Sequence, residues 1–149
     1  MPNKGADLPC QKTMKRLRDL PGWAVVEKVE HWNHFARRRH DLFGFADVIR
    51  VSVDGSFELY QVTTRGQMSA RRQKILGKPQ EGDKNPKEYA EYRFNALGIW
   101  LMAGGRVFVH GWGQPGGKHT EWLLTEWEIT RDEWEDTFET GVIPRRKKE

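Results

Sequence analysis

One stretch, residues 47–63, reads DVIRVSVDGSFELYQVT and decides the fold of the chain. Apolar and polar side chains alternate in both halves, which is typical of strands that bury one face. Asp54 and Gly55 stand between the halves and are a strong signal for a tight turn. We therefore predict an antiparallel hairpin with strands at 47–53 and 57–63.

The hydrophobic pattern also predicts the register of this hairpin, because a slip of one residue would turn every side chain to the other face. Burying the apolar sets together places Val53 opposite Phe57. The loop then has three residues, 54–56, with Gly55 in the left-handed conformation.

This register brings three polar side chains to the open end of the apolar face, namely Asp47, Gln61 and Thr63. A carboxylate where an apolar face ends is costly unless it is paired, hydrogen-bonded or bound to a metal. Asp47 is therefore either a metal ligand or an acceptor of backbone hydrogen bonds at the start of its strand. The other face is expected to be the outer, polar one, with Glu58 paired to a basic neighbour. This outer face carries Arg50, Ser52 and Glu58.

Helices and further strands are predicted on both sides of the hairpin. Asn85, Pro86 and Glu88 are typical of a helix start, and Gly104 with Gly105 ends the same helix. The predicted helices are 13–20 (capped by Thr13), 69–76, 86–103 and 131–140, and the other predicted strands are 23–30, 106–112 and 122–129. This order predicts an α/β fold with a mixed central β-sheet of about five strands flanked by helices.

The chain of 149 residues suits a single domain, 1–149, with a flexible N-terminus at 1–12 and a basic tail at 144–149. No apolar run approaches the ~20 residues that cross a membrane, and the first residues lack the apolar stretch of a signal peptide. The single cysteine, Cys10, excludes an internal disulfide. These features together lead us to expect a cytoplasmic protein with no membrane partner.

The charges are unevenly distributed along the chain. The net charge of +4 suits a polyanionic partner. Basic residues cluster at 12–18, 37–40, 65–78 and 145–148, whereas acidic residues dominate between 121 and 139. We therefore expect one basic face, directed at nucleic acid, and one neutral to acidic face.

The residues around the hairpin extend its pattern into that of a known superfamily. The chain reads EHWN at 30–33, RRRHDLFGFADVI at 37–49, LYQVTT at 59–64 and SARRQKI at 69–75. Asp-Leu-Phe-Gly followed by a second Asp, and then by a strand with Gln-x-Thr, resembles the PD-(D/E)xK, or restriction-endonuclease-like, nucleases. The similarity is to small phage and prophage proteins related to archaeal Holliday-junction resolvases and VRR-type nucleases. It covers about a third of the chain.

The resemblance implies a site for Mg²⁺ or Mn²⁺. In that superfamily an acid on the second strand and an acid on the third hold the ion, and a Lys two residues further along orients the attacking water. Asp47 matches the first acid, Gln61 the second and Thr63 the Lys position. An acid near the first strand often completes such a site, and Glu30 and Glu27 are the candidates here.

Further residues near the motif leave alternatives open. Asp41 either approaches the metal or orders the turn at Phe43 and Gly44 by hydrogen bonding. Gln61 offers only a neutral oxygen and Thr63 carries no charge, so Arg71 or Lys74 on the following helix would have to supply the missing positive charge. The catalytic candidates are Asp47, Gln61, Thr63 and Lys74, the metal ligands Asp47, Gln61, Glu30 and Asp41, and the DNA contacts Arg37, Arg38, Arg39, Arg71, Arg72 and Lys74.

The resulting hypothesis is a Mg²⁺-dependent endonuclease that acts on branched or otherwise structured DNA, as a phage or prophage protein in a bacterial host. Resolvase relatives pair two active sites, so a homodimer is one option. The alternative is a nucleic-acid-binding phage accessory protein that kept the fold and lost catalysis. The missing Lys and the missing second carboxylate favour this alternative.

Two other groups of residues give weaker indications of a functional role. His31, His34 and His40 lack the Cys pairs or the His-Glu-x-x-His helix that are typical of zinc sites, so surface or DNA-contacting histidines are the better interpretation. The seven Trp can stack on unpaired bases, but most, including Trp100, are expected in the core.

Overall fold

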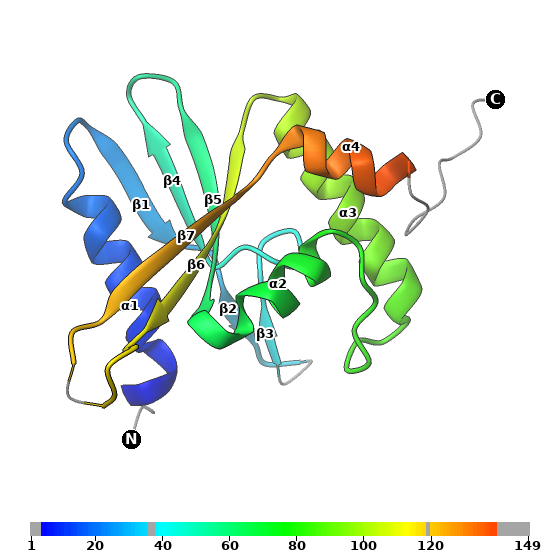
Figure 1. The fold of residues 1–149 in the computed structure, drawn as a ribbon. Coiled ribbons are helices and arrows are strands. Elements are labelled where there is room, and N and C mark those ends of the chain that lie inside the picture. Colours follow the sequence, from blue (N-terminus) through cyan, green and yellow to red (C-terminus); the bar gives the residue numbers. More distant parts are fainter. Residues whose placement is uncertain (1–3, 36–37, 119, 140–149) are drawn as a thin grey trace.

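A computed structural model describes residues 4–35, 38–118 and 120–139 of the chain (Figure 1). Within these residues, five strands form one mixed sheet in the order β1-β4-β5-β6-β7, in which β5 and β6 run parallel and the other neighbours antiparallel. The strands are β1 (Ala24–Lys28), β4 (Val48–Ser52), β5 (Phe57–Thr64), β6 (Arg106–Gly113) and β7 (Leu123–Ile129). The predicted α/β class with a mixed five-stranded sheet and flanking helices is confirmed.

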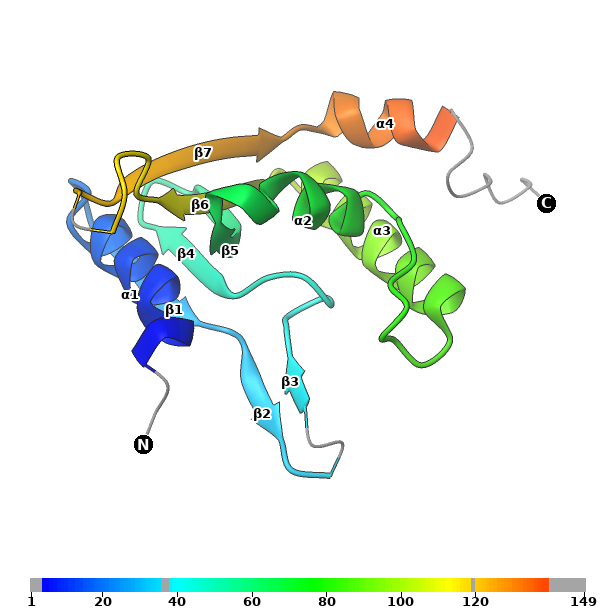
Figure 2. The same ribbon diagram turned by 60° about the horizontal axis from the view of Figure 1, so that its bottom comes forward.

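Helices cover both faces of this sheet. Helix α1 (Lys4–Arg18) lies on one face, and α2 (Met68–Ile75) and α3 (Pro86–Met102) lie on the other, where a short 3-10 turn, η1 (Arg65–Gln67), leads into α2 (Figures 1 and 2). Helix α4 (Arg131–Glu139) packs against α3, with the indole of Trp134 donating to the Phe94 carbonyl over 3.0 Å. None of the described helices is long and apolar enough to cross a membrane.

The two faces of the sheet carry separate cores, because successive side chains of a strand point to opposite faces. On the α2–α3 face the fully buried strand residues Leu59, Val107 and Val109 pack against both helices. On the α1 face the buried hydrophobic residues are Cys10, Leu17, Val26, Val48, Tyr60 and Phe108.

The hairpin of β4 and β5 forms as predicted, but its register is shifted by two residues. Val51, and not Val53, lies opposite Phe57. Ser52 donates its backbone N–H to Ser56 over 2.8 Å, so the three loop residues are 53–55, with Gly55 at φ 94°. A shift of two preserves the face of every side chain, and the cost is only that Val53 becomes a loop residue, 78% exposed.

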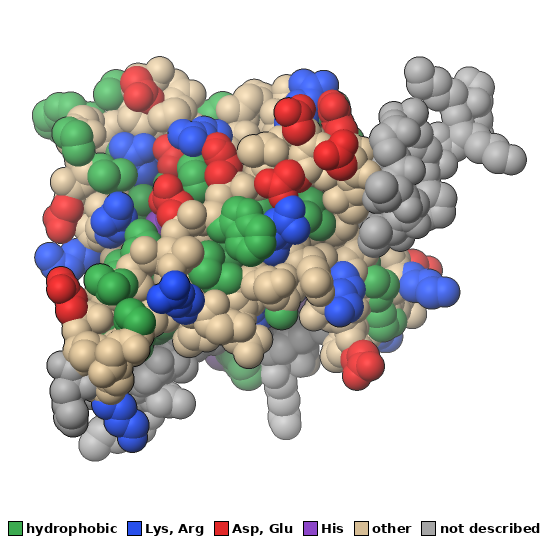
Figure 3. Space-filling view, viewed as in Figure 1, with side chains coloured by type: hydrophobic (Ala, Val, Ile, Leu, Met, Phe, Trp, Pro, Cys, Tyr) green, Lys and Arg blue, Asp and Glu red, His purple; other side chains and the backbone are tan. Residues whose placement is uncertain are grey.

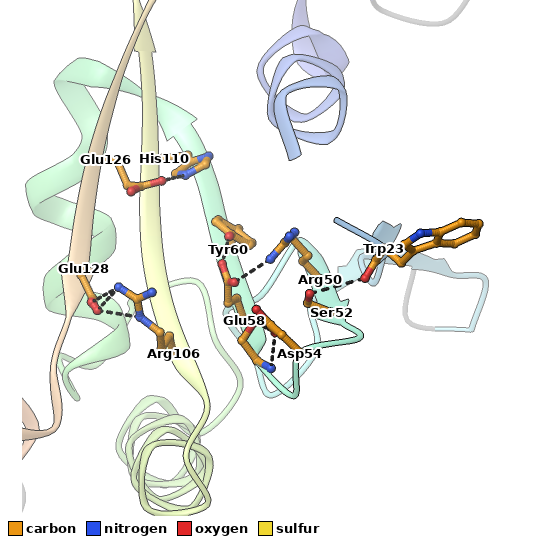
Figure 4. Close-up of polar contacts among 11 residues, drawn as sticks. Trp23, Arg50, Ser52, Asp54, Glu58, Tyr60, Arg106, His110, Glu126 and Glu128 are labelled. Carbon is orange, nitrogen blue, oxygen red and sulfur yellow. Dashed lines mark hydrogen bonds and ion pairs between the residues drawn. The ribbon is translucent and has the colours of Figure 1, made fainter. Parts of the chain in front are cut away.

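The face expected to be outer and polar is in fact covered by α1. Arg50 and Glu58 are buried there as an ion pair at 2.9 Å, and Tyr60 donates its hydroxyl hydrogen to the second oxygen of Glu58 (Figure 4). Burial and these contacts with Glu58 raise the pKa of the Tyr60 hydroxyl. The predicted pairing of Glu58 with a basic residue is confirmed. The prediction of an outer face was wrong because alternation distinguishes the two faces of a strand but does not show that a helix covers the polar one.

Helix α1 starts at Lys4, well before the predicted cap at Thr13, and takes in residues 4–12 that were expected in a flexible terminus. Thr13 is fully buried in the middle of the helix. Its hydroxyl contacts Nδ1 of His110 at 3.0 Å and accepts a hydrogen bond from the Trp112 indole at 2.9 Å. The polar side chain that resembled a cap is therefore an internal tether to β6.

A small two-stranded arm, absent from the predicted elements, projects from the main sheet. It consists of β2 (His31–Asn33) and β3 (Arg38–His40), and Figure 2 shows it extending away from the sheet between β1 and β4. Each strand has only three residues without apolar alternation, so no pattern in the sequence predicts a strand here.

Helix α3 begins at Pro86 as predicted, but Asn85 does not act as a side-chain cap. Asn85 adopts a left-handed conformation at φ 56° and makes no capping hydrogen bond. The predicted stop is confirmed, because the helix ends at Met102 and Gly104 follows at φ 98°.

Candidate metal centre

Three acidic side chains converge where the arm joins the main sheet. The pairing of β1 with β4 continues for one more residue, since Val29 donates its N–H to the Asp47 carbonyl over 2.9 Å. In the arm, His31 pairs with His40, so Glu30 and Asp41 are the next residues on its two strands. Carboxylate oxygens of Glu30, Asp41 and Asp47 all lie within 4.8 Å of one another.

A tight turn over residues 42–46 returns the chain from Asp41 to Asp47. Leu42 and Ala46 exchange both backbone hydrogen bonds, at 3.0 and 2.9 Å. Gly44 has φ 79°, and a Cβ placed on it would lie 2.7 Å from the side chain of the buried Arg93. The turn therefore needs glycine for its conformation and for the close approach of α3.

Gln61 supports the deepest of the three acids. Its side-chain amide donates to Oδ2 of Asp47 over 2.8 Å, and the same oxygen accepts the N–H of Val62 at 2.8 Å. Gln61 is 3% exposed, and its own Oε1 is buried with no hydrogen-bond partner among the described residues. A buried carbonyl oxygen without a donor is costly, which is a reason to expect a ligand there.

Lys74 of α2 brings a positive charge to the cluster. Its Nζ lies 3.8 Å from Oδ2 of Asp41, and both side chains are mostly buried. Burial lowers the pKa of the Lys74 ammonium, whereas the negative charge of Asp41 raises it. One ammonium among three carboxylates leaves the cluster with an excess of negative charge when all are ionised.

The pKa values of the acids reflect this excess. Burial, followed by the charge of Asp41, raises the pKa of the Asp47 carboxyl well above its ordinary value, and the charge of Glu30 adds to the effect. Burial also raises the pKa of Asp41, although the charge of Lys74 opposes it. A cation bound between the acids would remove the penalty that raises both values.

A cavity of about 260 Å³ opens beside the cluster. Asp41 and Lys74 belong to its wall, so the cavity reaches the cluster at Asp41. Nε2 of His40 is buried and has no hydrogen-bond partner among the described residues. The full lining is His40, Asp41, Gly44, Lys74, Gly82, Asp83 and Tyr89.

The structure brings together the four metal candidates and Lys74, but not every candidate residue. Thr63 is buried on β5, two residues beyond Gln61. Glu27 lies opposite Ile49 and is not part of the acidic cluster, so Glu30 is the acid that completes it. Asp41 approaches the metal candidates, and the turn at Gly44 is held by its backbone carbonyl.

The candidate DNA contacts lie in different parts of the chain, with Lys74 on α2 beside Asp41. Arg71 is half-buried and close enough to the cluster for its charge to lower the pKa of Asp41. Arg72 instead pairs with Glu133 of α4 and lies over the Trp127 ring, 4.7 Å from its centroid. Arg38 and Arg39 belong to β3, whereas Arg37 and the basic tail at 144–149 lie outside the described residues.

His40, a wall residue of the cavity, was interpreted from the sequence as a surface or DNA-contacting histidine, and its place beside the acids was not predicted. A second polar network, on the α1 face of β6, was missed entirely: His110 is fully buried between Thr13 and Glu126, with Nε2 2.8 Å from the Glu126 carboxylate. No pattern in the sequence joins residues that are 97 positions apart, as Thr13 and His110 are.

The chain was also compared with known proteins. No protein-family model, curated protein or solved structure matches it.

Proposed function

We propose that the chain is a Mg²⁺-dependent endonuclease of the PD-(D/E)xK type that acts on branched or otherwise structured DNA. The observation that carries the proposal is the convergence of the carboxylates of Glu30, Asp41 and Asp47. Asp47 is hydrogen-bonded to Gln61, whose own Oε1 is buried with no partner among the described residues, and Lys74 lies beside Asp41. The resemblance of residues 30–75 to that superfamily supplies the reaction class.

The donor atoms suit Mg²⁺ better than zinc. Mg²⁺ prefers oxygen ligands and keeps several waters, whereas zinc sites are usually built from Cys and His. Glu30, Asp41 and Asp47 offer carboxylate oxygens and Gln61 a carbonyl oxygen. Mn²⁺ accepts the same ligands. The residues therefore fit the ion that the resemblance implies.

The positions of the residues also fit the implied pattern. Asp47 directly precedes β4, the second strand of the main sheet in chain order, and Gln61 lies on β5, the third. Glu30 follows β1, the first. The implied Lys is replaced by Thr63, and the ammonium of Lys74, which lies 3.8 Å from Asp41, comes from α2.

When bound, Mg²⁺ would stabilise charge on the phosphate and lower the pKa of a bound water. The chain's own groups have three tasks. Gln61 and the Val62 N–H fix the orientation of Asp47. Lys74 holds a positive charge where negative charge develops on phosphate oxygens. The cavity beside Asp41 and Lys74 gives a reacting group a partly enclosed place next to the acids.

The distribution of charge supports a DNA partner near the acidic cluster of Glu30, Asp41 and Asp47. Acidic side chains gather over β7 and α4 in the space-filling view (Figure 3), on the segment 121–139. Arg71 and Lys74 lie on α2 next to the cluster, and the arm carries further arginines. Phosphate contacts of this kind give affinity without sequence preference. A homodimer and a cytoplasmic location stay predictions.

The second candidate is a nucleic-acid-binding phage accessory protein without catalysis. The specific observation in its favour is that Gln61 uses its amide to satisfy Asp47, so one of the two acids implied by the resemblance is a neutral residue that stabilises the other. Both candidates share a DNA partner, and they differ in whether phosphodiester bonds are cut.

A cleavage assay distinguishes them. Linear, nicked, flapped and four-way DNA are incubated with the full chain in Mg²⁺, in Mn²⁺ and in chelator. We expect metal-dependent cleavage of at least one branched form, with loss of cleavage and retention of binding in Asp47→Asn. Binding without cleavage of any substrate in either metal would leave the accessory protein as the function.

A further inference from the structure

A second concave site lies on the opposite, α1 face of the sheet. Three basic side chains of α1 and two indoles from the end of β6 and from the segment before β7 surround a cavity of about 440 Å³. We name it the tryptophan groove, and it is lined by Lys12, Lys15, Arg16, Asp19, Leu20, Trp112 and Trp122.

The two indoles present their ring faces to a common point. Nζ of Lys12 lies 5.9 Å from the centroid of Trp112 and 5.3 Å from that of Trp122. An ammonium is attracted to the negative face of an aromatic ring and not to its edge. Trp122 is half-buried and belongs to neither hydrophobic core, so packing alone does not account for its position.

The floor of the groove is rigid. Trp112 is 9% exposed, and its indole N–H donates to Oγ1 of Thr13 over 2.9 Å. Thr13 in turn contacts His110, which is held by Glu126. A ring fixed in this way loses little conformational freedom when a ligand covers it, which favours binding.

The charge of the groove selects an anionic ligand with a flat, aromatic part. Lys12, Lys15 and Arg16 provide three positive charges against one carboxylate, Asp19, which lies 3.5 Å from Lys15. Carboxylates of an acidic peptide would be repelled by the faces of the indoles. A base of duplex DNA has both faces covered, whereas an unpaired base stacks on an indole and leaves its phosphates for the cations.

We propose that the tryptophan groove binds an unpaired strand of DNA, with a base stacked on Trp122 and the adjoining phosphates at Lys15 and Arg16. Trp112 lies three residues beyond Val109, the β6 neighbour of Gln61, so the Cα atoms of Gln61 and Trp112 are roughly 11 Å apart. This inference rests on the proposed function for its DNA partner. It narrows the substrate to branched DNA that carries a single-stranded segment.

The test measures binding of a fluorescently labelled oligothymidylate to the full chain in chelator, so that neither metal nor cleavage enters. Trp122→Ala should weaken binding by roughly 5- to 150-fold, the range for loss of one stacked base, and Trp122→Phe should weaken it less. Trp23→Ala is the matched control, because Trp23 is 84% exposed and lies outside the groove. Lys15→Ala with Arg16→Ala should flatten the salt dependence by about 1.4 in slope, or two phosphate contacts.

Several results would contradict the proposal that the tryptophan groove binds an unpaired strand. Two of them concern the variants: a folded Trp122→Ala that binds the oligomer as tightly as the wild type, or equal losses of affinity in Trp122→Ala and Trp23→Ala. The other three concern the ligand: tighter binding of duplex than of single-stranded DNA, competition by an acidic peptide, or thymidine monophosphate binding as tightly as the oligomer. Failure of the proposed function is a separate result. Binding in chelator that depends on Trp122, together with no cleavage in Mg²⁺ or Mn²⁺, would exclude the proposed nuclease activity and still support the tryptophan groove as a binding site.

Discussion

The side-chain amide of Gln61 donates a hydrogen bond to Oδ2 of Asp47 over 2.8 Å, from β5 to the residue directly before β4. The backbone N–H of Val62 reaches the same oxygen. Asp47 is thus held in one orientation beside two further acids, although its burial and their charges both disfavour its ionised form. A buried carboxyl held in place although its charged form is disfavoured marks a candidate functional site.

The first prediction concerns stability without metal. Asp47→Asn should raise the free energy of unfolding at neutral pH, because burial and the charges of the neighbouring acids disfavour the ionised form of the wild-type carboxyl. Asn removes the charge and keeps an oxygen that can accept from Gln61 and Val62. Urea denaturation in chelator measures the difference.

The pH dependence gives this prediction its sign. The pKa of Asp47 in the folded protein lies above its ordinary value of 3.8. At a pH between these two values, the folded state therefore binds more protons than the unfolded state. The stability of the wild type therefore falls as pH rises from about 3.8 through the folded pKa. The advantage of Asn should be absent below this window and grow across it. A variant that is less stable than the wild type at every pH would mean that Asp47 serves only as a backbone hydrogen-bond acceptor.

The second prediction concerns stability with metal. Mg²⁺ should raise the melting temperature of the wild type, since an ion bound only by the folded state adds about 1.4 kcal/mol at tenfold its Kd. Asp47→Asn should lose this shift. Glu27→Gln is the matched control, because Glu27 is an exposed acid on β1 outside the cluster. Equal shifts in both variants would place the ion elsewhere.

The sequence predicted the sheet and the meeting of Asp47 with Gln61 because both depend on alternation along two adjacent strands. The register error of two residues left that meeting intact, since it preserved the faces. The placement of Glu30 and Asp41 was open, because it depends on an arm whose strands have three residues each. The face bearing Arg50 looked exposed because alternation distinguishes two faces but does not say that a helix covers the polar one.

The third prediction separates the two arginines that the sequence treated alike. Arg71→Ala should weaken DNA binding across sequences and reduce its salt slope, because Arg71 adjoins the acidic cluster. Arg72→Ala should leave the salt slope unchanged and lower stability by about 1 kcal/mol, through loss of Glu133 and of the Trp127 ring. Filter binding over a salt series and urea denaturation report the two effects. Equal salt slopes for the wild type and Arg71→Ala would exclude a phosphate contact.

The fourth prediction tests the buried ion pair beneath α1. Glu58→Gln should destabilise the fold by about 3–5 kcal/mol, because it leaves the guanidinium of Arg50 buried without a counter-charge. Replacing both partners, Arg50→Met with Glu58→Leu, should cost less than the single change. Urea denaturation of the three proteins decides this. A double variant less stable than Glu58→Gln would show that the pair stabilises the fold by more than its own desolvation cost.

The last prediction asks which residue supplies the positive charge of the site. If Lys74 has taken the role that the superfamily gives to a Lys at the position of Thr63, then Lys74→Met should abolish metal-dependent cleavage and leave Mg²⁺ binding in place. Thr63→Lys added to Lys74→Met should restore part of the activity, because Thr63 lies two residues beyond Gln61 on the same face of β5.

A companion change, Gln61→Glu, adds a fourth carboxylate to the cluster and removes the amide that supports Asp47. Mg²⁺ should therefore bind more tightly, while the metal-free protein becomes less stable because a further negative charge is buried among acids. Cleavage rates, calorimetric Mg²⁺ titration and urea denaturation report these effects separately.

Full activity in Lys74→Met would show that Lys74 takes no part in the mechanism. Failure of Thr63→Lys to restore any cleavage to an inactive but folded Lys74→Met would mean that the charge is needed at Asp41, where Lys74 holds it at 3.8 Å, and not at the end of β5.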